Sequence, residues 1–429
     1  MEYFREELFP CVSLTALQTD KFKTGCLTVH LLTQLRRETA AENAVLPYVL
    51  RRGTKSLGDM RRIAEKLDAL YGATVEPSVQ KLGEIQAIGF FADFPEDRFL
   101  PGDTDVLGEV VSLLGELLLS PKTRGGLFLP DYVDSERGKL VERIESARND
   151  KRGWAAKRLR ENMCAYEDYA VGAHGTADEA ESIHYVKLTK HYKELLSTSP
   201  IELFYCGSRP GKEVAVLLRE AFALLPRGEI DLELGTDIRM NAVEETPRYF
   251  TEEDEVSQGV LAVGFRLGAC MDDPDPAAIS VFNAVYGGGV SSKLFVNMRE
   301  KRSLCYYAFS LPDELKGVLT VLSGIAFDKY DEALGEILAQ LDAVRNGDIS
   351  PEELDTARRT VANGLRTGAD SPYYLASFYL RETVQGMDAS PDDIAALAET
   401  VTAEDVAAIA RGVELDAVYF LRGEEADGE

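Results

Sequence analysis

The chain has 429 residues, 45% of them hydrophobic and 28% charged, as is typical of a folded globular protein with more than one domain. Its formal net charge of −26 disfavours binding to nucleic acid or to an anionic membrane surface and favours a cationic partner. The six cysteines are scattered without a Cys-x-x-Cys pair, which predicts neither a zinc knuckle nor a redox pair. We expect a cytoplasmic protein, because the sequence shows neither a signal peptide nor a membrane-length apolar run.

In chain order, short strand-like runs alternate with longer helix-like runs in the first half of the chain. The predicted elements there are a strand over 26–32, a helix ending near Gly53, a helix over 57–71, a strand over 85–91, a strand over 201–206 and a helix over 214–225. The second half has a strand over 261–267, a helix ending near Gly287, a strand over 318–322 and a helix over 330–345. This alternation predicts an α+β fold in which helices cover mostly antiparallel sheets.

The chain also repeats itself once. The segment 130–137 matches 351–358 at an offset of 221 residues, and each begins with Pro and acidic residues, which suit the first turn of a helix. Downstream, Asp150 and Asp370 head two further similar runs, with one residue of slippage. A period this long predicts two homologous domains rather than a solenoid. We place the boundary in the polar stretch 227–246, giving domains 1–230 and 231–429.

The most specific segment of the sequence is Gly287-Gly288-Gly289 followed by Ser-Ser-Lys-Leu-Phe, an Arg-Glu pair and Leu-Cys-Tyr over 291–306. Together with the duplication and the Gly53-Thr54 pair after a helix, it resembles the pitrilysin/insulinase metallopeptidase family in its processing-peptidase branch. Within that family the chain is similar to a bacterial noncatalytic subunit associated with elongation factor P modification. The resemblance covers nearly the whole chain.

The resemblance implies a zinc motif whose residues have been lost. Family enzymes carry His-x-x-Glu-His on the first helix, where two histidines bind zinc and the glutamate accepts a proton from the metal-bound water. Here Ala44 and Tyr48 occupy the histidine positions and Pro47 occupies that of the glutamate, while Glu136 resembles the third zinc ligand. One ligand of three cannot hold zinc, so we expect no metal and no cofactor in this chain. We favour the interpretation of Glu136 as a solvated helix glutamate, because most exposed acidic residues have no specific role.

Other features of the family segment are retained. Arg299 and Tyr306 resemble the arginine and tyrosine that family enzymes direct at the bound peptide, where both can donate hydrogen bonds to a scissile carbonyl. The alternative is that Arg299 pairs with Glu300 while Tyr306 fills the core. The run Gly287-Gly288-Gly289 lacks the spacing of an ATP-binding loop and is either a structural turn or a substrate-binding loop.

These features lead to a main hypothesis with two alternatives. The resemblance implies a catalytically inactive subunit of a heterodimeric zinc peptidase. In it, Arg299, Tyr306 and half of a peptide-binding chamber would be supplied in trans to a homologous zinc-bearing partner. The first alternative is a peptide- or protein-binding module without hydrolysis, acting alone or as a homodimer. A serine or cysteine hydrolase is disfavoured, because the sequence has no Gly-x-Ser-x-Gly and no nearby Cys-His arrangement.

Overall fold

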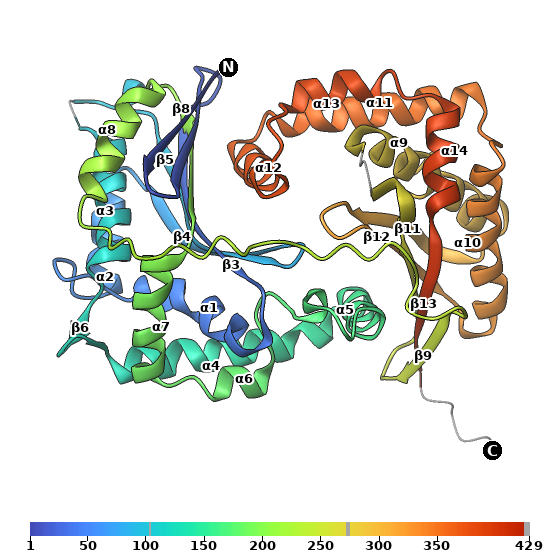
Figure 1. The fold of residues 1–429 in the computed structure, drawn as a ribbon, viewed down its shortest axis with the longest axis horizontal. Coiled ribbons are helices and arrows are strands. Elements are labelled where there is room, and N and C mark those ends of the chain that lie inside the picture. The colour runs from blue at the N-terminus through green and yellow to red at the C-terminus, as the bar shows by residue number, and fades with distance from the viewer. Residues whose placement is uncertain (103, 272–274, 424–429) are drawn as a thin grey trace. The chain divides into compact units, whose positions relative to one another are not determined.

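The computed structural model describes residues 1–102, 104–271 and 275–423 and divides the chain into two compact units. Unit 1 comprises 1–145, 171–235 and 370–388, and unit 2 comprises 146–170, 236–369 and 389–429. Each unit holds one mixed sheet with helices packed on it (Figure 1). The predicted α+β class with mostly antiparallel sheets is therefore confirmed.

Unit 1 is built on a six-stranded sheet in the order β1-β2-β8-β3-β5-β4. Its strands are β1 (Glu2–Phe9), β2 (Val12–Gln18), β3 (Thr24–Gln34), β4 (Thr74–Leu82), β5 (Ile85–Pro95) and β8 (Ile201–Gly207). All neighbouring strands run antiparallel except β2 and β8, which run parallel. The predicted strands 26–32, 85–91 and 201–206 lie within β3, β5 and β8.

Alternation along β3 separates the two faces of this sheet. Leu27, Val29 and Leu31 point into the main hydrophobic core, with residues of α1 (Arg37–Leu50), α3 (Val106–Leu119), α7 (Tyr185–Thr198) and α8 (Gly211–Ala221). Helices α2 (Met60–Ala69), α4 (Pro130–Ser146) and α6 (Ala177–Glu181) complete this layer. On the opposite face, the Cys26 thiol contacts the Pro372 carbonyl of α12 (Pro372–Gln385) at 3.6 Å.

Unit 2 repeats this plan with a five-stranded sheet in the order β11-β12-β10-β13-β9. Its strands are β9 (Arg248–Glu253), β10 (Gly259–Arg266), β11 (Cys305–Asp313), β12 (Val318–Ile325) and β13 (Glu414–Arg422), and β13 runs parallel to β9. Its helices include α5 (Lys151–Met163), α9 (Pro276–Tyr286), α10 (Tyr330–Arg345), α11 (Pro351–Gly368), α13 (Pro391–Ala398) and α14 (Ala403–Gly412). The predicted helix over 330–345 matches α10 residue for residue.

The two halves of the sequence exchange one helix each. Helix α5 belongs to the first half of the chain but packs on β10 and β13 of unit 2, whereas α12 belongs to the second half and packs on β3 and β8 of unit 1. These are the two similar runs that Asp150 and Asp370 head in the sequence. The predicted domains 1–230 and 231–429 are contiguous and do not include this exchange, because both units of the structure are discontinuous in sequence.

A buried charge network fixes the exchanged segment in unit 2. The fully buried Arg266 donates to Glu167 at 2.7 Å and to Asp416 at 2.8 Å, and Lys316, also fully buried, pairs with Glu167 at 2.8 Å. Glu167 follows α5 in sequence, so these ion pairs tie the lent segment to β10 and β13. Each charge is compensated, as burial in a low-dielectric interior requires.

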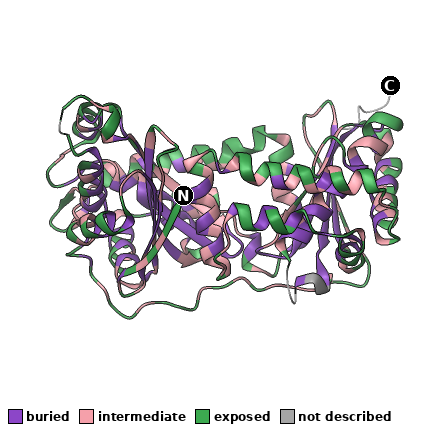
Figure 2. Ribbon diagram, turned by 90° about the horizontal axis from the view of Figure 1, so that it is seen from above, coloured by how far each residue is buried: buried purple, intermediate pink, exposed green. Residues whose placement is uncertain are grey.

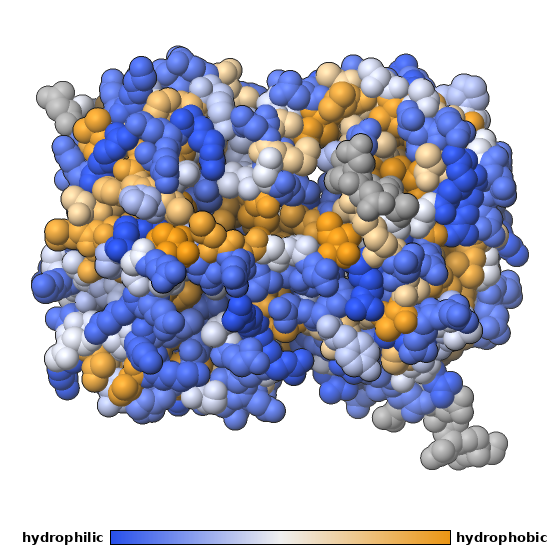
Figure 3. All heavy atoms as spheres, in the orientation of Figure 1, coloured by the Kyte–Doolittle hydropathy of each residue, from blue (hydrophilic) through white to orange (hydrophobic). Residues whose placement is uncertain are grey.

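Burial follows the layers in both units, with purple strands and helices whose outer faces are green (Figure 2). The surface in Figure 3 is mostly blue and white with smaller orange areas, in keeping with the charged content of the chain. Within 1–102, 104–271 and 275–423, none of the helices combines the length and the hydropathy that crossing a membrane requires.

Candidate functional site

Helix α1 carries the three positions that the sequence comparison with the zinc motif predicts to be degenerate, Ala44, Pro47 and Tyr48. Ala44 is fully buried in the core of unit 1, and Pro47 lies inside the helix, where its ring removes one backbone donor. Tyr48 is half-buried, and the Arg143 guanidinium of α4 lies over its ring at 4.4 Å from the centroid. A methyl group, a proline ring and a phenol under a cation replace the two imidazoles and the carboxylate of the motif.

Glu136, the residue that resembles the third zinc ligand, forms ion pairs with two basic side chains. Its side chain is 5% exposed on α4 and accepts hydrogen bonds from Arg52 Nη1 at 3.0 Å and from Lys139 Nζ at 2.8 Å. Arg52 also lies over the Tyr132 ring at 4.9 Å, which fixes its guanidinium beside the carboxylate. Reading Glu136 as a solvated helix glutamate was therefore wrong, because this carboxylate is buried and forms two ion pairs.

These residues do not fit a zinc ion. Zinc needs three protein ligands of nitrogen, sulfur or carboxylate type, and Ala44 has no donor atom while the Glu136 carboxylate is already neutralised. Two positive side chains beside the position also oppose a dication. Across the described ranges there is no group of three or more His, Cys, Asp or Glu residues arranged to hold a metal.

The two histidines of α7 and its N-cap have structural partners. His184 caps the N-terminus of α7, and His191 on the same helix contacts Asn43 Oδ1 through Nε2 at 2.6 Å. Asn43 in turn donates to Gln86 on β5 at 2.8 Å, so a buried polar chain links α7, α1 and the sheet. Burial lowers the pKa of His191, which therefore joins this chain as a neutral imidazole.

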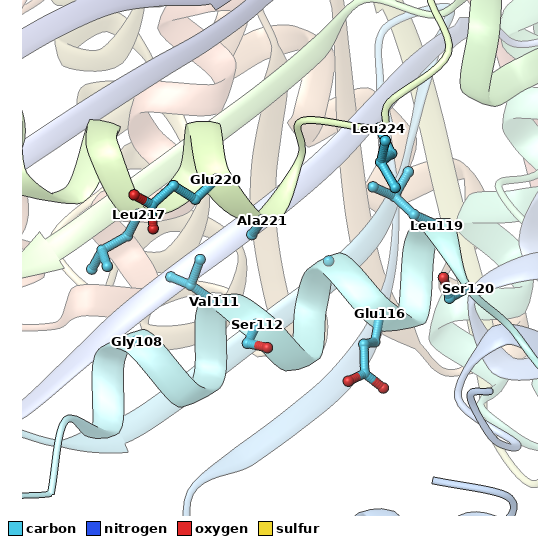
Figure 4. A pocket seen from close by; sticks show the side chains of 11 residues that line it. Gly108, Val111, Ser112, Glu116, Leu119, Ser120, Leu217, Glu220, Ala221 and Leu224 are labelled. Atoms are coloured by element: carbon cyan, nitrogen blue, oxygen red, sulfur yellow. The ribbon is translucent and has the colours of Figure 1, made fainter. Parts of the chain in front are cut away.

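The Gly53-Thr54 pair after α1 is structural. A side chain at Gly53 would meet the Gly58 carbonyl at 2.9 Å, and the buried Thr54 hydroxyl donates to Glu116 on α3 at 2.8 Å. Glu116 borders a groove of about 380 Å³ between α3 and α8. Figure 4 shows Leu217 and Ala221 on the α8 side of this groove. This groove holds none of the candidate residues.

Arg299 and Tyr306 both lie in unit 2 and both reach the surface. Arg299 is on a π-helical turn over Phe295–Lys301, with its guanidinium 4.9 Å from the centre of the Phe295 ring and its Nε 3.8 Å from Glu300. Tyr306 is 70% exposed at an irregularity in the pairing of β11 with β12. The alternative in which Tyr306 fills the core is therefore wrong, while the loose contact between Arg299 and Glu300 is present.

The glycine run after α9 divides into structural and open positions. A Cβ atom at Gly287 would lie 2.5 Å from Ser310 Oγ, and one at Gly288 would lie 2.8 Å from Asn283 Nδ2, so both positions require glycine. Gly289 has open space around its Cα atom. The turn is thus held by its first two glycines, and Gly289 is the member that contact with a ligand could use.

Two repeated α+β units with an emptied metal motif define the class of inactive metallopeptidase relatives. Residues 182–361 match the family model described as Peptidase M16 inactive domain. The chain is 32% identical over 428 residues to the probable inactive metalloprotease YmfF of Bacillus subtilis strain 168, covering 99% of each. The chain therefore belongs to the M16 peptidase family, which confirms the resemblance to pitrilysin and insulinase relatives.

Solved structures agree with this assignment of fold. A conserved protein from Enterococcus faecalis V583 superimposes with a TM-score of 0.88 at 26% identity, covering 99% of this chain and 100% of its own. The peptidase M16 inactive domain from Pseudomonas fluorescens gives 0.79 at 15% identity, with 100% of both chains covered. The link to elongation factor P modification stays a prediction.

Proposed function

We propose that this protein is the noncatalytic subunit of a heterodimeric zinc peptidase, in which a homologous partner carries the metal. The chain would supply half of a peptide-binding chamber and place Arg299 and Tyr306 against the substrate carbonyl. No zinc or other cofactor would bind to this chain itself. Members of the M16 family often pair with homologous subunits, which makes such a partner reasonable.

The observation that carries this proposal is an asymmetry between the two units. The zinc position of unit 1 has been rebuilt around Glu136, Arg52 and Lys139, whereas Arg299 and Tyr306 in unit 2 keep exposed polar groups. The two side chains also keep the spacing of seven residues and the flanking segment that the resemblance gives to the family's arginine and tyrosine. The retained pair therefore favours a role toward a peptide that another subunit cleaves.

The chemistry expected of the pair is hydrogen-bond donation. As water attacks a peptide carbonyl, negative charge develops on the oxygen, and a guanidinium and a phenol that are already positioned stabilise that charge. Arg299 is held by its ring contact, which lowers the entropy lost when it binds. Gly289, with open space around it, would border the same peptide.

Trans catalysis can be tested by reconstituting the pair with Arg299→Ala or Tyr306→Phe and measuring kcat/KM for peptide cleavage. We expect a loss of about 10²-fold for either substitution, as for removal of an oxyanion donor. Lys301→Ala, on the same turn, and Tyr166→Phe, another exposed tyrosine of unit 2, are the matched controls and should stay near the unmutated rate. Equal rates for all four variants would refute the role of the pair.

A second candidate function is a non-hydrolytic polypeptide-binding module that acts as a homodimer. The rebuilt zinc position favours it as much as it favours the heterodimer, because neither function needs a metal in this chain. Sedimentation of the purified chain with and without the zinc-bearing homologue separates the two. A homodimer that excludes the homologue and binds peptides would support the module.

A further inference from the structure

Helix α5 is unusually basic for an acidic chain. It carries five basic residues against one acidic residue, although the protein as a whole has a net charge of −26. It is also the helix that the first half of the sequence lends to unit 2. If all of these basic side chains form ion pairs within the protein, the charge of α5 serves folding alone; a basic side chain without such a pair can bind a ligand.

Most of the cations on α5 have structural partners. Lys151 pairs with Asp254 at 2.8 Å, Lys157 with Glu161 at 3.7 Å, and Arg158 with both Glu161 and Glu252 at 2.6 and 2.7 Å. These contacts attach the helix to β9 and to its own last turn. Burial raises the pKa of Tyr169 well above its usual value, and the partly buried Arg160 opposes this rise.

Arg152 differs from its neighbours. It is exposed, and its guanidinium lies 4.7 Å from the centre of the Tyr307 ring and 5.9 Å from that of Phe309, both on β11. Among the described residues it makes no ion pair within 4.0 Å. The nearest acid along the chain, Asp150, turns its carboxylate toward Gly153 at the start of the helix.

A guanidinium that is stacked on a ring in this way can bind a carboxylate. The ring contact fixes the arginine side chain, while the N–H groups at the edge of its plane stay free to donate, often in pairs, to an anion. Along the same face of β11, alternation places Leu311, which is 53% exposed. We call Arg152, Tyr307, Phe309 and Leu311 the β11 strip.

We propose that the β11 strip binds a carboxylate-bearing segment of a polypeptide, with Arg152 as the residue that selects for the acid. This deepens the proposed function, on which it rests, by naming the class of substrate that unit 2 would prefer. An acidic ligand differs from the cationic partner that the net charge of −26 favours, but charges beyond about 8 Å are largely screened at physiological salt, so the local cation at Arg152 determines the preference at this strip. The apolar rings and Leu311 would contact the residues next to the acid.

The test is direct binding to this chain alone, by fluorescence polarisation at physiological salt. Three labelled peptides are compared: one with a central Glu and a C-terminal amide, its Gln counterpart, and the Gln peptide with a free C-terminal carboxylate. We expect the Glu peptide to bind about three- to tenfold more tightly than the Gln amide, as for one exposed charge-assisted contact. Tight binding of the free-carboxylate peptide instead would assign the selected acid to a chain terminus.

Substitutions on α5 identify the responsible residue. Arg152→Gln should remove the preference for the acid and leave affinity for the Gln amide unchanged, while Arg152→Lys should keep only part of it. Arg158→Gln removes the same charge from the same helix and should keep the preference; Lys157→Gln replaces it if that variant unfolds. The proposal is overturned if the wild type binds no peptide, shows no preference for the acid, or loses it equally in the control. Because no hydrolysis is measured, an inactive reconstituted pair would leave this result intact.

Discussion

Glu136→Gln tests whether the residue that resembles a zinc ligand has a structural role in unit 1. In a zinc enzyme, losing the carboxylate ligand releases metal. Here the carboxylate is 5% exposed and holds Arg52 at 3.0 Å and Lys139 at 2.8 Å, so its loss leaves two cations without their counter-ion. The expected defect is therefore one of stability rather than of metal content.

The size of the defect follows from the exposure of the partners. Arg52 is 22% exposed and its hydrogen bond to a buried carboxylate is worth about 1.5–3 kcal/mol. Lys139 is 52% exposed, so solvent screening reduces its share to about 0.5 kcal/mol or less. The sum is about 1.5–3.5 kcal/mol, which lowers Tm by about 3–14 °C for a unit of this size.

The assay is thermal and urea unfolding of the variant, with Glu142→Gln as the control. Glu142 is an exposed glutamate on the same helix, so its substitution changes the net charge equally and should change stability by less than about 0.5 kcal/mol. Neither zinc nor a chelator should shift the Tm of the wild type, because a ligand stabilises only a protein that binds it. Unchanged stability in Glu136→Gln, or a chelator that lowers the wild-type Tm, would refute the reasoning.

Three further predictions concern the interior of the two units. Burial lowers the pKa of His30 to about 4, below its value of about 6.5 in the unfolded chain, so the unfolded state binds more protons and stability falls as pH drops from 6.5 toward 4. At pH 5 the loss is about 2 kcal/mol by linkage, and His30→Gln should flatten this slope in urea titrations at pH 5 and 7. Arg266→Met removes one cation from each of two buried carboxylates, while Glu167 keeps Lys316 and Asp416 keeps Arg248, and should cost about 1.5–3 kcal/mol in urea unfolding, against under about 1 kcal/mol for the more exposed Arg239→Met. Gly287→Ala should lower Tm because its Cβ would lie 2.5 Å from a hydroxyl, whereas Gly289→Ala should not; equal shifts would contradict the division of that loop.

The sequence was sufficient for the fold class and for the local starts of several helices. Pro130 and Pro351 each begin a helix, as their place before acidic residues predicted, and Ser350 and Glu353 form a capping box at the second. Such features are local, because a proline ring and a capping side chain act within one turn. The emptied zinc motif was also readable, since a missing donor atom is visible in the residue type alone.

The helix exchange could not be read from the sequence. The repeat shows that the runs headed by Asp150 and Asp370 are equivalent, and both are helices, but amphipathic periodicity does not state which sheet a helix covers. That choice depends on tertiary partners such as Glu167, whose ion pairs join it to residues far along the chain. The pairing of Glu136 with Arg52 was missed for the same reason, although the spacing of three to Lys139 gave a local signal.

The most direct test of the central claim is co-purification. The chain is co-expressed with a homologue that carries an intact zinc motif, the complex is purified through a tag on this chain only, and zinc content and peptide cleavage are measured. We expect a one-to-one complex with about one zinc ion and an activity that this chain lacks by itself. A zinc-free homodimer that leaves the homologue behind, or zinc and cleavage with this chain alone, would contradict this expectation.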